Sequence, residues 1–153
     1  MSELLLKLAG DATVRGLTTG AGLQVFSAYD FINLVCQKTG NYSRQVWKCL
    51  IDAGCVRKDE YTMEFTEYHY GIHRNTRVRQ TPMMTLRALQ RLVMILRGKV
   101  AADFRQIVEG VFTRFQSGDL SMIEEIRPNA ASTAPIHQAY RQALAQEPVV
   151  DAA

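Results

Sequence analysis

The sequence is poor in the residues on which secreted and membrane proteins depend. It has only three cysteines, Cys36, Cys49 and Cys55, in 153 residues. An odd number without a framework spacing indicates reduced thiols, which suits a cytoplasmic or nuclear protein. The opening stretch MSELLLKLAG has a short apolar run that is broken by Lys7. We therefore expect neither a signal peptide nor a membrane span, which needs ~20 apolar residues.

Histidines are also few, and their positions do not favour catalysis. They stand at positions 69, 73 and 137, two in a basic stretch and one near the end of the sequence. A nucleophile needs a base beside it and a third group to orient that base, and no such set is visible. The adjacent pairs Asp59–Glu60 and Glu124–Glu125 should point apart into solvent. We expect neither an enzyme nor a cofactor.

A zinc site is the other chemistry that scarce residues could supply. Cys49, Cys55, His69 and His73 follow the order of a Cys2His2 site. Structural sites usually separate the two cysteines by two to four residues, whereas five intervene here. We expect no metal, with the cysteines filling apolar space and the histidines joining the basic surface.

The composition is that of one ordinary folded domain, with 47% apolar and 22% charged residues. The apolar periodicity predicts an α+β fold: a small antiparallel sheet or hairpin packed with four to five short helices. Residues 1–22 are expected to form an N-terminal arm or loop, residues 23–128 the globular domain, and residues 129–153 a tail with one plausible helix. No internal repeat is present.

Helix starts and buried faces can be assigned from local pattern. Ser27 and Thr85 stand where a helix cap is expected, and Asn41 or Ser43 could cap the helix between them. Apolar spacing in the helix predicted for residues 101–115 places several side chains in the core. These are Phe104, Ile107, Val108, Val111 and either Phe112 or Phe115.

Acidic residues are missing from one long segment. Between Tyr68 and Ala102 there are seven lysines or arginines and no aspartate or glutamate. The segment therefore carries +7, whereas the other residues, with 11 basic and 15 acidic side chains, carry −4. Clustering of this kind is typical of phosphate binding, although a solvated basic face would look the same in sequence.

The basic residues of this segment fall on two predicted elements. Arg77 and Arg79 alternate along a strand that ends a β-hairpin with a basic tip containing His73 and Arg74. Arg87 and Arg91 stand one turn apart on the next helix, and Arg97 and Lys99 flank the glycine after it. We expect these residues to hold a phosphate backbone, which positions a complex without reading its sequence.

A second candidate surface lies earlier in the chain. The two short helices predicted for residues 27–40 and 41–54 are joined by a tight link, an arrangement that resembles a helix-turn-helix. Arg44, Gln45 and Lys48 would lie at the exposed start of the second helix and could read base edges. Any αα-hairpin has polar residues there, so the pattern alone does not decide between the two readings.

Three stretches together resemble one known family. They are LQVFSAYDFINLVCQ, NYSRQVWKCL and TPMMTLRALQRLVMILRGKVAADFRQIVEGVFTRF, within residues 23 to 115. In this order they resemble the Bro-N family, the N-terminal domain of viral BRO proteins and of phage antirepressor-like proteins. The resemblance implies a non-enzymatic, regulatory α+β domain that binds nucleic acid, with DNA the expected partner.

The competing hypothesis is a protein-interaction or oligomerisation module. Its support is the aromatic cluster Tyr61, Tyr68 and Tyr70 beside arginines, a mixture that is enriched at protein interfaces. A two-fold homodimer would be ordinary for a domain that binds a duplex, but no heptad or dimer face is evident in the sequence.

Overall fold

The computed structural model describes residues 14–70 and 75–146, and at 65–70 and 75–78 only the backbone is described. Its antiparallel sheet has the order β1-β2-β4-β3. The strands are β1 (Gly16–Thr18), β2 (Gln24–Ser27), β3 (Thr62–Tyr70) and β4 (Asn75–Met84). Within the described residues the helices are α2 (Ala28–Cys36), α3 (Tyr42–Asp52), α4 (Leu86–Val93), α5 (Lys99–Gln116), α6 (Met122–Ala131) and α7 (Pro135–Gln146), with a 3₁₀ turn η1 (Lys58–Glu60). The predicted α+β class is confirmed, with one helix more than expected.

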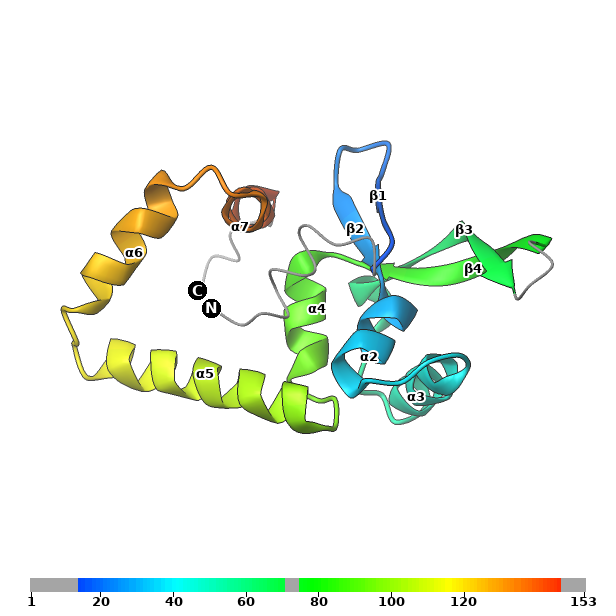
Figure 1. The fold of residues 1–153 in the computed structure, drawn as a ribbon, viewed down its shortest axis with the longest axis horizontal. Coiled ribbons are helices and arrows are strands. Elements are labelled where there is room, and N and C mark those ends of the chain that lie inside the picture. The colour runs from blue at the N-terminus through cyan, green and yellow to red at the C-terminus, as the bar shows by residue number, and fades with distance from the viewer. Residues whose placement is uncertain (1–13, 71–74, 147–153) are drawn as a thin grey trace.

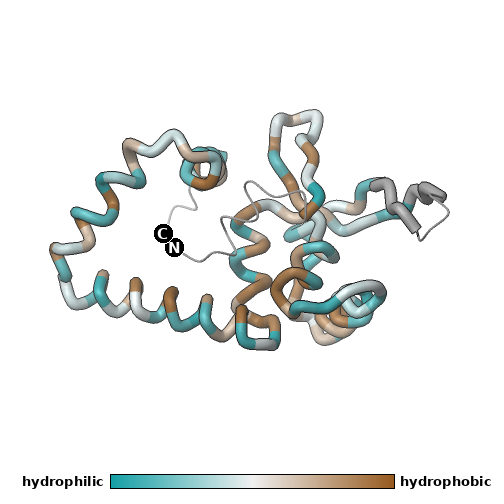
Figure 2. The backbone as a smooth tube through the Cα atoms, viewed as in Figure 1, coloured by the Kyte–Doolittle hydropathy of each residue, from teal (hydrophilic) through white to brown (hydrophobic). Residues whose placement is uncertain are grey.

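The core forms where α2 and α4 meet the base of the sheet. Phe31, Ile32, Leu89 and Leu92 from the two helices are each at most 1% exposed, and so is Met84 at the end of β4. Figure 1 shows the two elements that extend away from this centre, the β3–β4 ribbon on one side and α5 on the other. Figure 2 shows that the brown, apolar parts of the backbone gather at the centre.

Local capping fixes where two of these helices begin. The Ser27 hydroxyl accepts a hydrogen bond from the Asp30 amide at 3.2 Å, and the Thr85 hydroxyl accepts one from the Ala88 amide at 3.2 Å. Both predicted caps are confirmed. Asn41 stands at the N-cap position of α3 but its side chain makes no capping hydrogen bond, and Ser43 is buried. Asn41 is therefore correctly predicted as the N-cap position of α3, but no side-chain hydrogen bond caps this helix.

The packed unit extends beyond the predicted boundaries 23 and 128 at both ends. β1 pairs with β2, and Val14 just before it is only 5% exposed. At the other end, Ile136 of α7 is 2% exposed and belongs to the same hydrophobic core, because α7 packs against α4. Residues 129–146 are therefore no separate tail.

The predicted burial of α5 is correct for Phe104 and wrong for the residues after it. Phe104 is 6% exposed, but Ile107, Val108, Val111, Phe112 and Phe115 are 37–70% exposed. Their spacing is that of a buried face, yet no described residue between 105 and 133 belongs to the core or packs against it. As Figure 1 shows, α5 runs past the end of α4, and α6 lies beyond it. None of the helices in the described ranges is long and apolar enough to cross a membrane.

Candidate nucleic-acid interface

The β3–β4 ribbon positions the first group of predicted binding residues. Its register runs from Thr62 opposite Met83 to Tyr70 opposite Asn75, so the predicted hairpin is confirmed and longer than expected. Arg77 pairs with Tyr68, and Arg79 pairs with Thr66. Because neighbours two apart on a strand share a face, positions 77 and 79 lie on one side of the ribbon. The predicted tip residues His73 and Arg74 lie outside the described residues.

Packing of aromatic rings joins the base of this ribbon to α3. The Tyr61 ring, just before β3, meets the Trp47 ring edge to face at 5.0 Å, and Trp47 also meets Tyr29 of α2 at 6.4 Å. Trp47 is 7% exposed, so it anchors α3 on the core. Tyr61 is half-buried in this packing. It is therefore part of the scaffold and not the exposed aromatic residue that the interaction hypothesis expected.

The α3 helix presents its three predicted residues differently. Gln45 and Lys48 are exposed. Arg44 is half-buried, and its guanidinium lies 5.6 Å from the centre of the Tyr29 ring, within the range of a cation–π interaction. α2 and α3 pack on each other, as a helix-turn-helix requires. The residues available to a ligand on this helix are therefore Gln45 and Lys48, while Arg44 contributes to its packing.

The fold brings Arg97 next to α3, which the sequence did not indicate. A groove of about 550 Å³ separates α3 from the segment that follows α4. Gln45 and Cys49 line one wall, and Ile95 and Arg97 line the other. At its floor the Cys36 thiol donates a hydrogen bond to the Arg97 carbonyl at 3.5 Å, and burial raises the pKa of this thiol. Two predicted residues separated by about fifty positions thus share one groove.

Two of the predicted basic residues already have carboxylate partners. Arg91 Nε lies 3.0 Å from Glu60 Oε1, and Lys99 Nζ lies 2.8 Å from Asp103 Oδ2. The hydrogen bond to Asp103 raises the pKa of Lys99. The Glu60 side chain is only 11% exposed, so it is not the solvated carboxylate that the sequence suggested. Both pairs reduce the positive charge of the basic segment, one in the last turn of α4 and the other at the start of α5.

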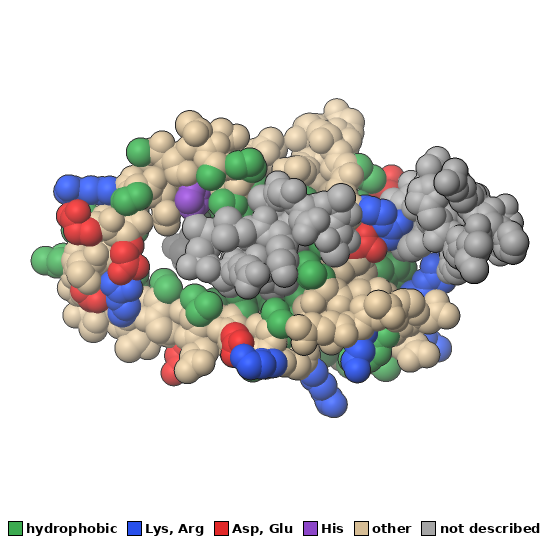
Figure 3. All heavy atoms as spheres, viewed as in Figure 1, with side chains coloured by type: hydrophobic (Ala, Val, Ile, Leu, Met, Phe, Trp, Pro, Cys, Tyr) green, Lys and Arg blue, Asp and Glu red, His purple; other side chains and the backbone are tan. Residues whose placement is uncertain are grey.

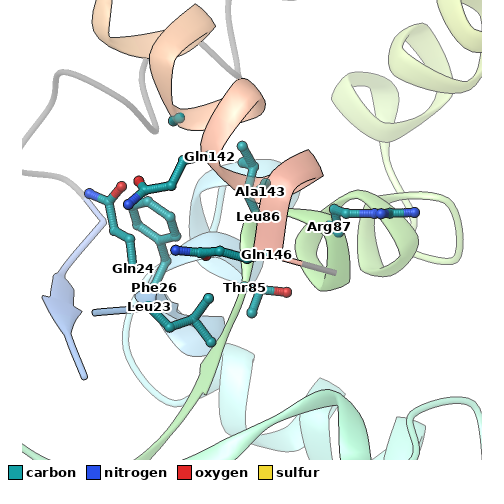
Figure 4. A pocket seen from close by; sticks show the side chains of 10 residues that line it. Leu23, Gln24, Phe26, Thr85, Leu86, Arg87, Gln142, Ala143 and Gln146 are labelled. Atoms are coloured by element: carbon teal, nitrogen blue, oxygen red, sulfur yellow. The ribbon is translucent and has the colours of Figure 1, made fainter. Parts of the chain in front are cut away.

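Arg87 stands beside a pocket that does not suit a phosphate. The pocket, of about 120 Å³, lies between β2, α4 and α7. Figure 4 shows Gln24, Gln142 and Gln146 close to Phe26 there, whereas Arg87 extends away from them. The lining is mainly apolar, with three neutral glutamine amides and Arg87 as its single charged residue. We therefore interpret this pocket as incomplete packing between α7 and the core.

The surface charges agree with the finding that carboxylates lie next to some of the basic residues. Figure 3 shows blue side chains with red side chains beside them at the base of the β3–β4 ribbon, and blue side chains along the edge formed by α3. Over α5 and α6 the two colours mix. Positive charge is therefore less uniform on the surface than in the sequence.

Metal binding gains no geometric support within the described parts of the chain. They contain no group of three or more histidine, cysteine, aspartate or glutamate side chains that could hold a metal ion. Cys49 and Cys55 are exposed free thiols, so the expectation that they fill apolar space is wrong. His69 and His73 were the other candidate ligands, and their side chains are not described.

Sequence reasoning missed the acidic partners Glu60 and Asp103. Asp103 could have been found, because it stands four residues after Lys99 on a predicted helix. Glu60 gave no signal, since 31 residues separate it from Arg91.

Comparison of the chain with protein-family models, with curated proteins and with solved structures found no match.

Proposed function

We propose that this protein binds nucleic acid, with duplex DNA as the target, through the β3–β4 ribbon and the neighbouring surface of α3. The observation that carries the proposal is the basic segment 68–102, whose first part forms the end of β3 and all of β4 in a two-stranded ribbon that extends from the core. A two-stranded β-ribbon is of a size that enters the major groove of DNA. We assign the main contacts to phosphate to Arg77 and Arg79, together with Arg74 and His73 of the predicted tip.

Arginine suits this role on a strand. Its guanidinium offers five donors in a planar fork that matches a phosphate, and residues two apart project to the same side. Positions 77 and 79 can therefore contact one backbone strand together. The register supports this, because both positions lie in continuous pairing with β3 and not in a loop.

The α3 surface supplies the residues proposed to read bases. Gln45 and Lys48 are exposed there, and glutamine can form two hydrogen bonds to adenine while lysine can donate to guanine. Arg97 lies across the groove from Gln45 and adds positive charge to the same surface. Arg44 would act indirectly by holding Tyr29, and Arg87 remains a weaker candidate beside the α7 pocket.

Arg91 and Lys99 are assigned a smaller share of the binding. Each would have to leave a carboxylate at about 3 Å before it could meet a phosphate. Their removal should therefore change DNA affinity only modestly. We also propose the regulatory role that the resemblance to the Bro-N family implies.

The test is fluorescence anisotropy of labelled duplex and single-stranded DNA over a salt series. We expect binding that weakens with a log–log slope of about −0.9 for each phosphate contacted on duplex DNA. The double variant Arg77→Ala/Arg79→Ala should lower the magnitude of this slope by about 2 and the affinity by ~10-fold or more.

A matched control separates a specific surface from net charge. Arg57, directly before η1, and Arg127, on α6, are exposed arginines with exposed carboxylate neighbours. The variant Arg57→Ala/Arg127→Ala removes the same total charge and should leave affinity nearly unchanged. Equal losses in both double variants, or no binding at low salt, would contradict the proposal. The second outcome would favour a protein-interaction module without nucleic-acid binding.

A further inference from the structure

The strongest feature outside the proposed DNA surface is an apolar face on α5 that has no partner among the described residues. It consists of Ile107, Val108, Val111, Phe112 and Phe115, and we call it the α5 face. Phe112 is 63% exposed and Phe115 is 70% exposed. Leu120, Ile123 and Ile126, in the following turn and on α6, are also apolar and 42–76% exposed. Figure 2 shows brown segments recurring along α5 after it leaves the core.

The spacing of this face is that of a helix that packs against another helix. At 100° a residue its five side chains fall within an arc of about 140°, a continuous stripe and not a scatter. Phe104, Val108, Val111 and Phe115 follow one another at intervals of four, three and four, which is the seam of a helix pair. Phe104 at one end is 6% exposed and already packed in the core, so the seam begins inside the protein and continues outward.

We propose that a second copy of this chain covers the α5 face, so that two α5 helices pack together in a two-fold symmetric dimer. In such a dimer the same patch serves both subunits, which requires a surface that complements itself. The proposal does not depend on nucleic-acid binding.

The exposed area is sufficient for this partner. Eight partly exposed apolar side chains of this size present on the order of 800 Å², which matches the ~800 Å² that each subunit contributes to a standard interface. Exposed apolar patches larger than a few hundred Å² are rare on monomeric proteins and mark interaction sites. The exposed apolar area of the α5 face, taken together with that of α6, is at least as large as this.

The charges around the face also favour a second copy. Residues 99–131 contain four basic and five acidic side chains, a net charge of −1. Such a surface neither attracts phosphate nor repels its own copy strongly. Nucleic acid and anionic membranes are therefore poor occupants.

A local ionic arrangement joins the end of α5 to the start of α6. Arg114 Nη2 lies 2.6 Å from Glu125 Oε1, and Arg114 Nε lies 2.7 Å from Asp119 Oδ2. These contacts tie the last turns of α5 to the start of α6 without burying either apolar surface. They hold the corner between the two exposed apolar helices in place.

Sedimentation equilibrium of the full chain without nucleic acid tests the proposal. Because interfaces of standard size reach micromolar or tighter affinity, the chain should be mainly dimeric at roughly 20 µM and above. The variant Phe112→Glu/Phe115→Glu should weaken the dimer by at least ~100-fold, as expected for central aromatic residues of an interface. Both side chains are exposed in the monomer, so circular dichroism should show an unchanged fold.

The matched control places the same charges on other exposed apolar residues. Met63 on β3 is 44% exposed and Met94 at the end of α4 is 39% exposed. The variant Met63→Glu/Met94→Glu should remain dimeric, and the wild-type dimer should persist at high salt. A wild-type chain that stays monomeric at roughly 100 µM, well above the micromolar range, would overturn the proposal. So would a dimer that survives in the Phe112→Glu/Phe115→Glu variant.

Discussion

The guanidinium of Arg91 and the carboxylate of Glu60 form an ion pair that joins α4 to the turn before β3, with 3.0 Å between Nε and Oε1. The second carboxylate oxygen of Glu60 accepts a hydrogen bond from the Arg57 amide at 2.8 Å. Glu60 therefore fixes the start of the β3–β4 ribbon to a core helix. The ribbon is proposed to bind DNA, so this pair connects the stability of the core with the position of the binding surface.

Replacing Glu60 with alanine should destabilise the protein. The change leaves Arg91 without its carboxylate and the Arg57 amide without its acceptor, and we expect a loss of ~1–2 kcal/mol in the free energy of unfolding. Urea denaturation followed by the fluorescence of Trp47, the single tryptophan, measures it. Asp59→Ala is the control, because the Asp59 side chain is 71% exposed and should contribute under ~0.5 kcal/mol. Equal effects of the two variants would contradict this role of Glu60.

The three helix starts should respond differently to loss of the cap residue. Ser27→Ala and Thr85→Ala each remove a hydroxyl that accepts an amide hydrogen bond, and each should cost ~1 kcal/mol of stability. Asn41→Ala should cost much less, because the Asn41 side chain makes no capping hydrogen bond. The measurement is the urea midpoint of the three variants. A loss at Asn41 as large as at Ser27 would show that the α3 start is capped in solution.

The packing of α7 on the core can be tested with two residues of the same helix. Ile136 is 2% exposed, and Ile136→Ala should lower the free energy of unfolding by ~2–4 kcal/mol through lost burial and a residual cavity. Leu144 is 74% exposed, so Leu144→Ala should have little effect. Both are measured by thermal or urea unfolding. If Ile136→Ala proved as harmless as Leu144→Ala, α7 would not be part of the core.

The α5–α6 corner should be sensitive to acid. Hydrogen bonds from Ser121 and then Arg114 lower the pKa of Asp119 to about 2, and Arg114 also lowers the pKa of Glu125. A carboxyl whose pKa is lower in the folded state contributes stability above its unfolded pKa, ~3.9 for aspartate, and loses it as pH falls through the folded value. The corner should therefore loosen between about pH 4 and pH 2.

Amide hydrogen exchange of residues 114–125 over this range detects that loosening. Asp119→Asn removes the titrating group, so the variant should exchange faster already at pH 6 and change less between pH 4 and 2. A wild-type corner whose protection does not fall in that range would contradict the assignment.

Sequence by itself determined the features that depend on neighbours along the chain. At Ser27 and Thr85 a hydroxyl residue stands directly before a helical apolar pattern, where it can accept a hydrogen bond from the amide three residues later. The β3–β4 hairpin follows from two runs of alternating side chains separated by turn-forming residues. The order of α2 and α3 follows from apolar residues at helical spacing. Each of these depends on interactions within a few residues, so local pattern was enough.

Only the tertiary structure decided which of these elements face one another. A helical stripe states that one face is apolar but not what covers it, so the α5 face looked like core while the chain leaves it exposed. In the same way, a run of basic residues records charge but not the distant Glu60 that meets Arg91. Ile136 joins the core because α7 returns to α4, a contact across about fifty residues that no local pattern encodes. Partners far apart in the chain are selected by packing, and this packing narrows the candidate binding surface to the ribbon, α3 and Arg97.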